Sequence, residues 1–159
     1  MLYTPIKNKE KQVSFAEYEK DLKKRSFEGR VCYIIKIIYG EKTGQRHETI
    51  KIGFTDTLFD KKCPFSGKKI RGRIYTIMSD LQRTYGYAKV VEILMVFKEH
   101  DMSSASIKRF ESFLLKETKE HSFPLAGKHE YRAIEKRSEV IETCQKIANN
   151  FSDYVQLIV

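Results

Sequence analysis

The stretch Val31-Cys32-Tyr33-Ile34-Ile35-Lys36-Ile37, followed after a polar loop by Thr49-Ile50-Lys51-Ile52-Gly53-Phe54-Thr55, decides the fold of this chain. Both runs are rich in β-branched and aromatic residues, which is the composition of strands. Between them, residues 40–44 begin and end with glycine and indicate a turn. We therefore predict strands over 31–39 and 49–54 that pair as an antiparallel hairpin.

Apolar residues at helical spacing or in β-branched runs predict the other elements. Helices are expected over 68–84, 104–120 and 135–150, a third strand over 88–97, and a short edge strand over 129–134. Ser14, with Glu17 three residues later, has the capping-box spacing for a helix over 14–26. We expect a mixed α/β (α+β) fold, in which a small three-stranded antiparallel sheet is flanked by helices, with an extra N-terminal helix and a C-terminal helix.

A chain of 159 residues has the size of one domain. We divide it into an N-terminal arm and helix (1–30), a central domain (31–134), and a C-terminal helix and tail (135–159) that packs on the same domain. Its three cysteines are far apart, which predicts neither a disulfide framework nor a zinc site. Because neither a signal peptide nor a membrane span is visible, we expect an intracellular protein, cytoplasmic or nuclear, with no membrane partner.

Positive charge points to a polyanionic partner. Thirty Lys and Arg against 21 Asp and Glu give a formal net charge of +9, and basic proteins gain affinity for nucleic acid by releasing its counterions. Between residues 61 and 79 there are six basic residues and no acid. We predict DNA as the partner, with RNA as the alternative, bound by Lys61, Lys62, Lys68, Lys69 and Arg73. A merely solvated charged face is the competing interpretation.

One acidic residue interrupts an apolar helical stripe. Glu111 falls within the stripe of the helix predicted over 104–120, which is set by Ile107, Phe110 and Leu114. A carboxylate that points inward needs a partner such as an ion or an arginine. The alternative is a residue at the edge of the stripe that reaches water or pairs with Lys108.

The serial order of these features resembles the GIY-YIG nuclease superfamily. The chain is most similar to the branch whose second motif is Lys-Ile-Gly-x-Thr, here Lys51 to Thr55. Members of that branch tend to have a Glu in the helix after the third strand and a closing Glu followed by an aromatic residue, and Glu111 and Glu130-Tyr131 stand at those places. The resemblance covers 31–134 and implies a GIY-YIG-like nuclease domain that hydrolyses DNA phosphodiester bonds.

The resemblance also implies a site. Glu111 would bind one divalent metal, Mg²⁺ or Mn²⁺, and the other catalytic residues would be Tyr33, Lys51, Arg71 and Tyr75. Arg71 and Tyr75 match the family's Arg-x-x-x-Tyr/His spacing and would share one helical face, with Arg73 as the competing assignment. Lys51 would act as a base if burial or a neighbouring Arg lowered its pKa, and otherwise would bind phosphate as a point charge, which we favour.

Three departures from the family keep other functions open. The first motif is Val-Cys-Tyr rather than Gly-Ile-Tyr, 17 residues separate Tyr33 from Lys51, and Leu115 stands where several relatives have a His. A catalytically degenerate module that binds nucleic acid without cutting it is therefore the alternative. A protein-interaction module is the third hypothesis, in which the apolar tail 155–159 could form a partner strand or a homodimer strand.

Overall fold

The predicted hairpin is confirmed. The computed structural model describes residues 30–99, 106–125 and 127–158. Strands β1 (Val31–Gly40) and β2 (Arg46–Thr55) pair antiparallel in a continuous register, from Val31 opposite Thr55 to Gly40 opposite Arg46. Both faces of β1 are covered, so every residue of this strand is buried.

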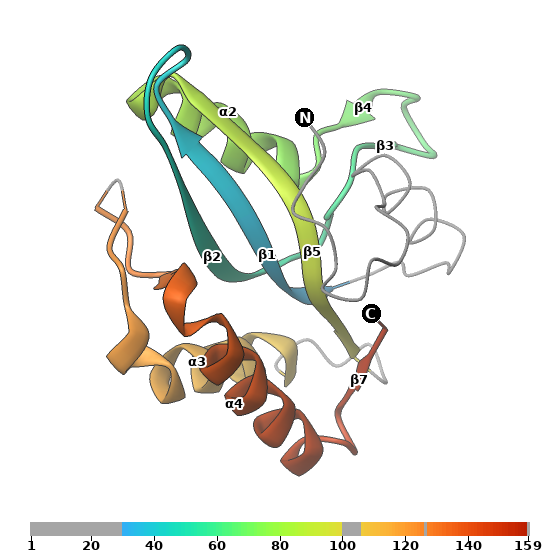
Figure 1. The fold of residues 1–159 in the computed structure, drawn as a ribbon. Coiled ribbons are helices and arrows are strands. Elements are labelled where there is room, and N and C mark those ends of the chain that lie inside the picture. The colour runs from blue at the N-terminus through green and yellow to red at the C-terminus, as the bar shows by residue number, and fades with distance from the viewer. Residues whose placement is uncertain (1–29, 100–105, 126, 159) are drawn as a thin grey trace, which may run out of the picture.

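β1 is the middle strand of a curled antiparallel sheet of five strands in the order β6-β2-β1-β5-β7 (Figure 1). The other strands of this sheet are β5 (Tyr87–Glu99), β6 (Tyr131–Ala133) and β7 (Val155–Leu157). A separate two-stranded sheet is formed by β3 (Lys61–Lys62) and β4 (Lys69–Ile70). Figure 1 shows this second sheet projecting from the main one near the start of the first described helix.

The prediction of a small three-stranded sheet flanked by helices is therefore wrong. The finding that overturns it is the five-stranded curled sheet with its two-stranded companion and, in the described residues, three helices, a mixed α/β arrangement. The edge strand predicted over 129–134 is present as β6, but the three-stranded prediction included neither β6 nor β7 in the main sheet. Each has three residues, too few for a pattern to indicate where the strand pairs. They form because β2 and β5 offer edge N–H and C=O groups that gain partners by pairing.

Helices cover both faces of the sheet (Figure 1). The described helices are α2 (Arg73–Tyr85), α3 (Ser106–Glu117) and α4 (Arg137–Asn150), with short 3-10 turns η1 (Lys119–His121) and η2 (Ile134–Lys136). α2 packs on the face that presents Tyr33, whereas α3 and α4 pack on the face that presents Cys32. The helix predicted over 14–26 lies outside the described residues. Within the described ranges, no helix is long and apolar enough to cross a bilayer.

α2 begins later than predicted. The segment before it pairs as β4, and Gly72 then packs against the chain at Phe59, where a Cβ would lie 2.6 Å from the Phe59 Cα. The Gly72 N–H donates to Asp60 at 2.6 Å, and the Arg73 N–H donates to the Thr57 carbonyl at 2.8 Å. These contacts fix the first turn, so that Arg73 rather than Lys68 is the first helical residue.

A buried arginine joins β6 to α3. Arg132 is 2% exposed, and its guanidinium donates to Thr118 Oγ1 at 2.8 Å and to the Leu115 carbonyl at 2.9 Å. It also donates to the carbonyls of His129 and Tyr131, both at 2.8 Å. The almost fully buried guanidinium therefore donates to four acceptors between β6 and the end of α3.

Replacing Arg132 by Met is expected to lower the free energy of unfolding by about 3 kcal/mol, because several buried acceptors lose their donor. Urea denaturation followed by circular dichroism measures this change. The control is Arg83→Met, since the Arg83 side chain is 79% exposed and its ion pair with Asp80 is 3.6 Å long. That variant should stay within about 0.5 kcal/mol of the parent, and equal effects would contradict a structural role for Arg132.

Candidate active site

Tyr33 and Gly53 face each other across the central hairpin. The register places them opposite each other on the face covered by α2. The Tyr33 ring lies over the glycine so closely that a Cβ at position 53 would be 2.6 Å from the ring carbon that bears the hydroxyl. The glycine of the Lys-Ile-Gly motif therefore leaves room for the tyrosine ring to cross β2.

Lys51 lies two residues before Gly53 and on the same face of β2. It is 1% exposed, and a buried ammonium needs a partner. Glu130 forms an ion pair with it, and the Lys51 Nζ also lies 4.9 Å from the centre of the Tyr131 ring. The lysine that was predicted as a site residue is thus held inside the protein rather than displayed at a strand edge.

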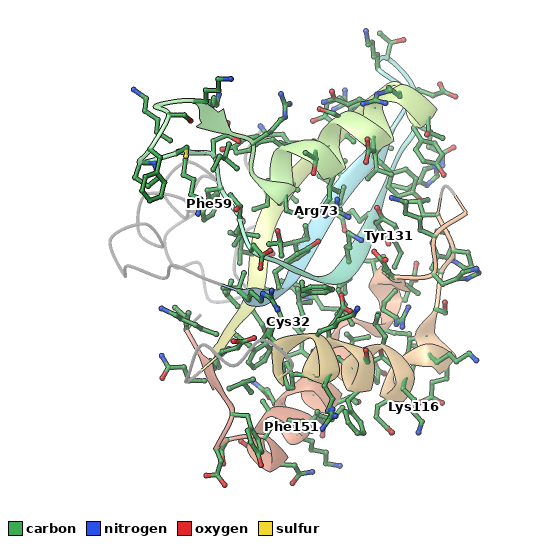
Figure 2. The ribbon with its side chains drawn as sticks, turned by 180° about the vertical axis from the view of Figure 1, so that it is seen from behind. Cys32, Phe59, Arg73, Lys116, Tyr131 and Phe151 are labelled. Atoms are coloured by element: carbon green, nitrogen blue, oxygen red, sulfur yellow. The ribbon has the colours of Figure 1, made fainter. Side chains whose placement is uncertain are left out.

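Arg73 completes this group from α2. Its guanidinium forms a side-chain hydrogen bond with the Tyr33 hydroxyl. Burial raises the pKa of Tyr33 well above its usual value, although the hydrogen bond and charge of Arg73 oppose the shift. Figure 2 shows Arg73 beside Tyr131 in the space between α2 and β2.

Glu130 and Lys51 control each other's protonation. Burial lowers the pKa of Lys51 and the positive charge of Arg73 lowers it further, against the opposing hydrogen bond with Glu130. Burial would raise the pKa of Glu130, but the hydrogen bond and charge of Lys51 outweigh it, so that the pKa of this carboxyl lies below its usual value. Glu130 is therefore a carboxylate at neutral pH.

Glu111 approaches the same end of the hairpin from α3. Its neighbours in the stripe, Phe110 and Leu114, are buried in the core, while Glu111 itself is partly buried. Its carboxylate accepts a hydrogen bond from the Phe54 N–H at the end of β2. Burial raises the pKa of Glu111 to about 6, with a contribution from the negative charge of Glu130 and an opposing one from Lys51.

A pocket of about 190 Å³ opens beside this group. Its polar wall consists of Lys51, Arg73, Lys128, Tyr131, Asp80 and Thr84, and its apolar wall of Ile77 and Leu81. Three of these side chains are cationic and one is acidic, so an anionic group such as a phosphate fits its charge. The pocket has room for water and part of a ligand rather than for a whole drug-sized molecule.

The other predicted catalytic residues lie elsewhere. Arg71 precedes α2, is exposed, and donates to Ser79 at 3.1 Å. Tyr75 lies in the first turns of α2 and is half-buried, but it does not line the pocket. Because the helix begins at Arg73, Arg71 and Tyr75 do not share a helical face, and Arg73 is the arginine that reaches Tyr33.

The predicted nucleic-acid contacts separate into two places. Lys61, Lys62, Lys68 and Lys69 are exposed on the two-stranded sheet. Arg73, predicted with them, is instead half-buried in the pocket. Two residues of this group, Lys128 and Glu130, were not predicted to have a role in the site. For Glu130, its place directly before an aromatic residue was the signal that could have identified it.

The acidic residues fit a single Mg²⁺ or Mn²⁺ ion. A bound cation would relieve the repulsion between Glu111 and Glu130 that helps to raise the pKa of Glu111. Mg²⁺ is held by one or two carboxylates together with water and substrate phosphates, and does not need a cage of protein ligands. In the described ranges, no three Asp, Glu, His or Cys side chains gather as a metal site. A divalent metal in this group would therefore have few protein ligands, with Glu111 as the candidate and with water and substrate as the others.

The chain matches no protein-family model, no curated protein and no solved structure.

Proposed function

We propose that this protein is a metal-dependent endonuclease that hydrolyses DNA phosphodiester bonds through a GIY-YIG-like active site. The observation that supports this most is the meeting of Tyr33, Lys51, Arg73 and Glu130 around Gly53. Glu111 approaches the same end of the hairpin from α3, which packs on the other face of the sheet. These residues come from distant parts of the chain. Placing a buried lysine, a buried tyrosine and an arginine beside a small cationic pocket costs folding free energy, which is typical of functional sites.

Hydrolysis of a phosphodiester needs positive charge at the phosphate, a group that takes a proton from water, and a donor for the departing oxygen. Arg73 and Lys128 line the pocket and would bind the non-bridging oxygens. A divalent metal held by Glu111 would supply further Lewis acidity at the phosphate. The remaining two tasks fall to Lys51 and Tyr33.

Tyr33 would act as a proton donor rather than as a base. Its pKa is raised by burial, so the hydroxyl keeps its proton near neutral pH. Arg73 donates to its oxygen, which leaves the Tyr33 O–H free to donate to an oxygen of the substrate. This hydroxyl would stabilise negative charge that develops on the leaving oxygen.

Lys51 is better suited to the base role than to the phosphate-binding role that the sequence favoured. Burial and the neighbouring Arg73 lower its pKa, which was the condition for a lysine base. Its ion pair with Glu130 orients the amine next to the pocket. The neutral amine form of Lys51, which a lowered pKa makes more accessible, would accept a proton from the attacking water, and the ammonium that results would pair with Glu130.

Two substitutions of Lys51 separate these roles. Lys51→Arg keeps a positive charge but cannot release a proton near neutral pH, whereas Lys51→Met removes both properties. If Lys51 is a base, both variants should lose about 100- to 10,000-fold in cleavage rate. Single-turnover cleavage of a labelled oligonucleotide measures the loss, and thermal unfolding shows that both variants are folded. Substantial activity in Lys51→Arg alone would mean that Lys51 binds phosphate.

The proposed function is tested by incubating the purified protein with supercoiled plasmid and with single-stranded DNA, in Mg²⁺, in Mn²⁺ and in EDTA. Cleavage that requires the metal and rises with protein concentration supports the proposal. Absence of cleavage in every condition overturns it. If DNA is then still bound in a salt-sensitive manner, the protein is a binding module instead.

A further inference from the structure

The two-stranded sheet ends in a closed and well-defined turn. Residues 63–68 connect β3 to β4, and two backbone hydrogen bonds close them, from the Cys63 N–H to the Lys68 carbonyl at 2.8 Å and from the Gly67 N–H to the Cys63 carbonyl at 2.9 Å. Gly67 has a φ of 69°, which suits glycine. The turn therefore presents its outermost side chains in a fixed direction.

Phe65 in this turn is the most exposed large hydrophobic residue of the described chain. It is 97% exposed, whereas the other exposed large hydrophobic residues of the described chain lie between 37% and 58%. A phenylalanine gains nothing for folding when it is left in water. No contact within the described part of the chain explains its presence at the tip, and a contact outside the chain would.

The stem below Phe65 is cationic. Lys61, Lys62 and Lys68 are all exposed. Lys69 pairs with Asp60 at 3.0 Å, and that ion pair joins the stem to the body of the protein. An aromatic tip on a stem of lysines is complementary to a ligand that combines flat apolar rings with regularly spaced negative charges.

The hairpin has a fixed place relative to the pocket. Asp60, which pairs with the stem, also accepts the Gly72 N–H at 2.6 Å, immediately before α2 begins at Arg73. Arg73 is eight positions after Phe65, so their Cα atoms can be no more than about 29 Å apart. A DNA segment of about nine base pairs has that length, so one substrate could contact both places.

We propose that the β3–β4 hairpin is a base-stacking finger for DNA: Phe65 stacks on a nucleobase while Lys61, Lys62 and Lys68 contact the phosphates on either side. This inference rests on the proposed function, because it assigns substrate contacts to the same enzyme. Stacking needs no particular base, so the finger would hold and unstack DNA near the pocket without selecting a sequence.

The test measures DNA binding by the full chain with EDTA present, so that cleavage does not interfere. The probes are a fluorescein-labelled single strand and a duplex, each of about 20 nucleotides and each also prepared with 2-aminopurine, at about 50 and 200 mM salt. Phe65→Ala should weaken binding about 5- to 150-fold with an unchanged salt dependence, and should abolish the change in 2-aminopurine fluorescence. The triple Lys61, Lys62 and Lys68 to Ala variant should instead reduce the salt dependence.

The matched control is Phe123→Ala, since Phe123 is 44% exposed on a different part of the surface. It should bind DNA as the parent does. Equal binding by Phe65→Ala and the parent overturns the finger, as does a dependence on Phe65 that is seen for anionic lipid vesicles and not for DNA. The two proposals fail separately: metal-dependent cleavage that is unaffected by Phe65→Ala removes only the finger, and Phe65-dependent binding without cleavage removes only the nuclease.

Discussion

Replacing Glu111 by Gln is expected to reduce DNA cleavage by about three orders of magnitude and, at the same time, to make the protein more stable. The loss of activity follows because the amide cannot supply the negative charge that would hold the metal. Single-turnover cleavage in Mg²⁺ measures it. DNA binding in EDTA should be retained, since Glu111 is not among the side chains that line the cationic pocket.

The gain in stability follows from the sign of the pKa shift. Burial raises the pKa of Glu111 from its usual value of 4.5 to about 6 in the folded protein, so folding disfavours the charged form of this side chain. The stability of the parent therefore falls as pH rises from about 4.5 to about 6, and the deficit persists at higher pH. Gln keeps an acceptor for the Phe54 N–H and carries no charge. At pH 7.5 in EDTA, the variant should gain about 1 to 2 kcal/mol, or a few degrees in melting temperature.

A control on the same helix separates this effect from a general effect of removing charge. Glu117 is exposed at the end of α3, so Glu117→Gln should change neither cleavage nor melting temperature appreciably. If Glu111→Gln cleaves DNA as well as the parent does, Glu111 is not the metal ligand. If it is inactive but also less stable, the carboxylate has a structural role and the inactivity no longer supports a catalytic one.

Elements with long and regular patterns could be predicted from the sequence. The β1 and β2 runs have enough β-branched and aromatic residues to specify strands without tertiary information, and the antiparallel hairpin followed from the turn between them. The short edge strand predicted over 129–134 is present as β6, but the places of β6 and β7 in the main sheet could not be predicted, because their pairing is decided by the open edges of β2 and β5. The first residue of α2 could not be predicted either. It is set by the contacts of Gly72 with Phe59 and Asp60, and the apolar spacing of the helix contains no sign of these contacts.

The candidate site, like the fold, has some residues that the sequence could identify and others that depend on tertiary contacts. Tyr33, Lys51 and Glu111 were identified from motif order, and the structure brings Tyr33 and Lys51 to one face of the hairpin, with Glu111 at its end. The sequence could not decide whether Arg71 or Arg73 is the arginine of the site. The answer depends on the residue at which α2 begins, because a shift of two residues changes which arginine faces the sheet. The pairing of Lys51 with Glu130 joins residues 79 positions apart, and the sequence offers no local signal for its geometry.

Gly53→Ala is expected to damage both stability and activity, although it adds a single methyl group. That methyl would lie 2.6 Å from the Tyr33 ring carbon that bears the hydroxyl, so the ring or the strand must move. Overpacking of this kind costs about 1 to 3 kcal/mol. Displacing the ring also breaks the hydrogen bond between Tyr33 and Arg73, and misplacement by about 1 Å can reduce a reaction rate about 100-fold. Urea denaturation and single-turnover cleavage measure the two losses.

A double-mutant cycle shows whether the Tyr33 ring is the cause. In a Tyr33→Ala background the obstacle is absent, so adding Gly53→Ala should then cost less than about 0.5 kcal/mol. Equal costs in both backgrounds would mean that the glycine is required by the backbone of β2 rather than by the tyrosine. The expected result is a large coupling energy between two residues on neighbouring strands. It would explain why a glycine follows Lys51-Ile52, because a residue without a side chain leaves room for the Tyr33 hydroxyl to reach Arg73.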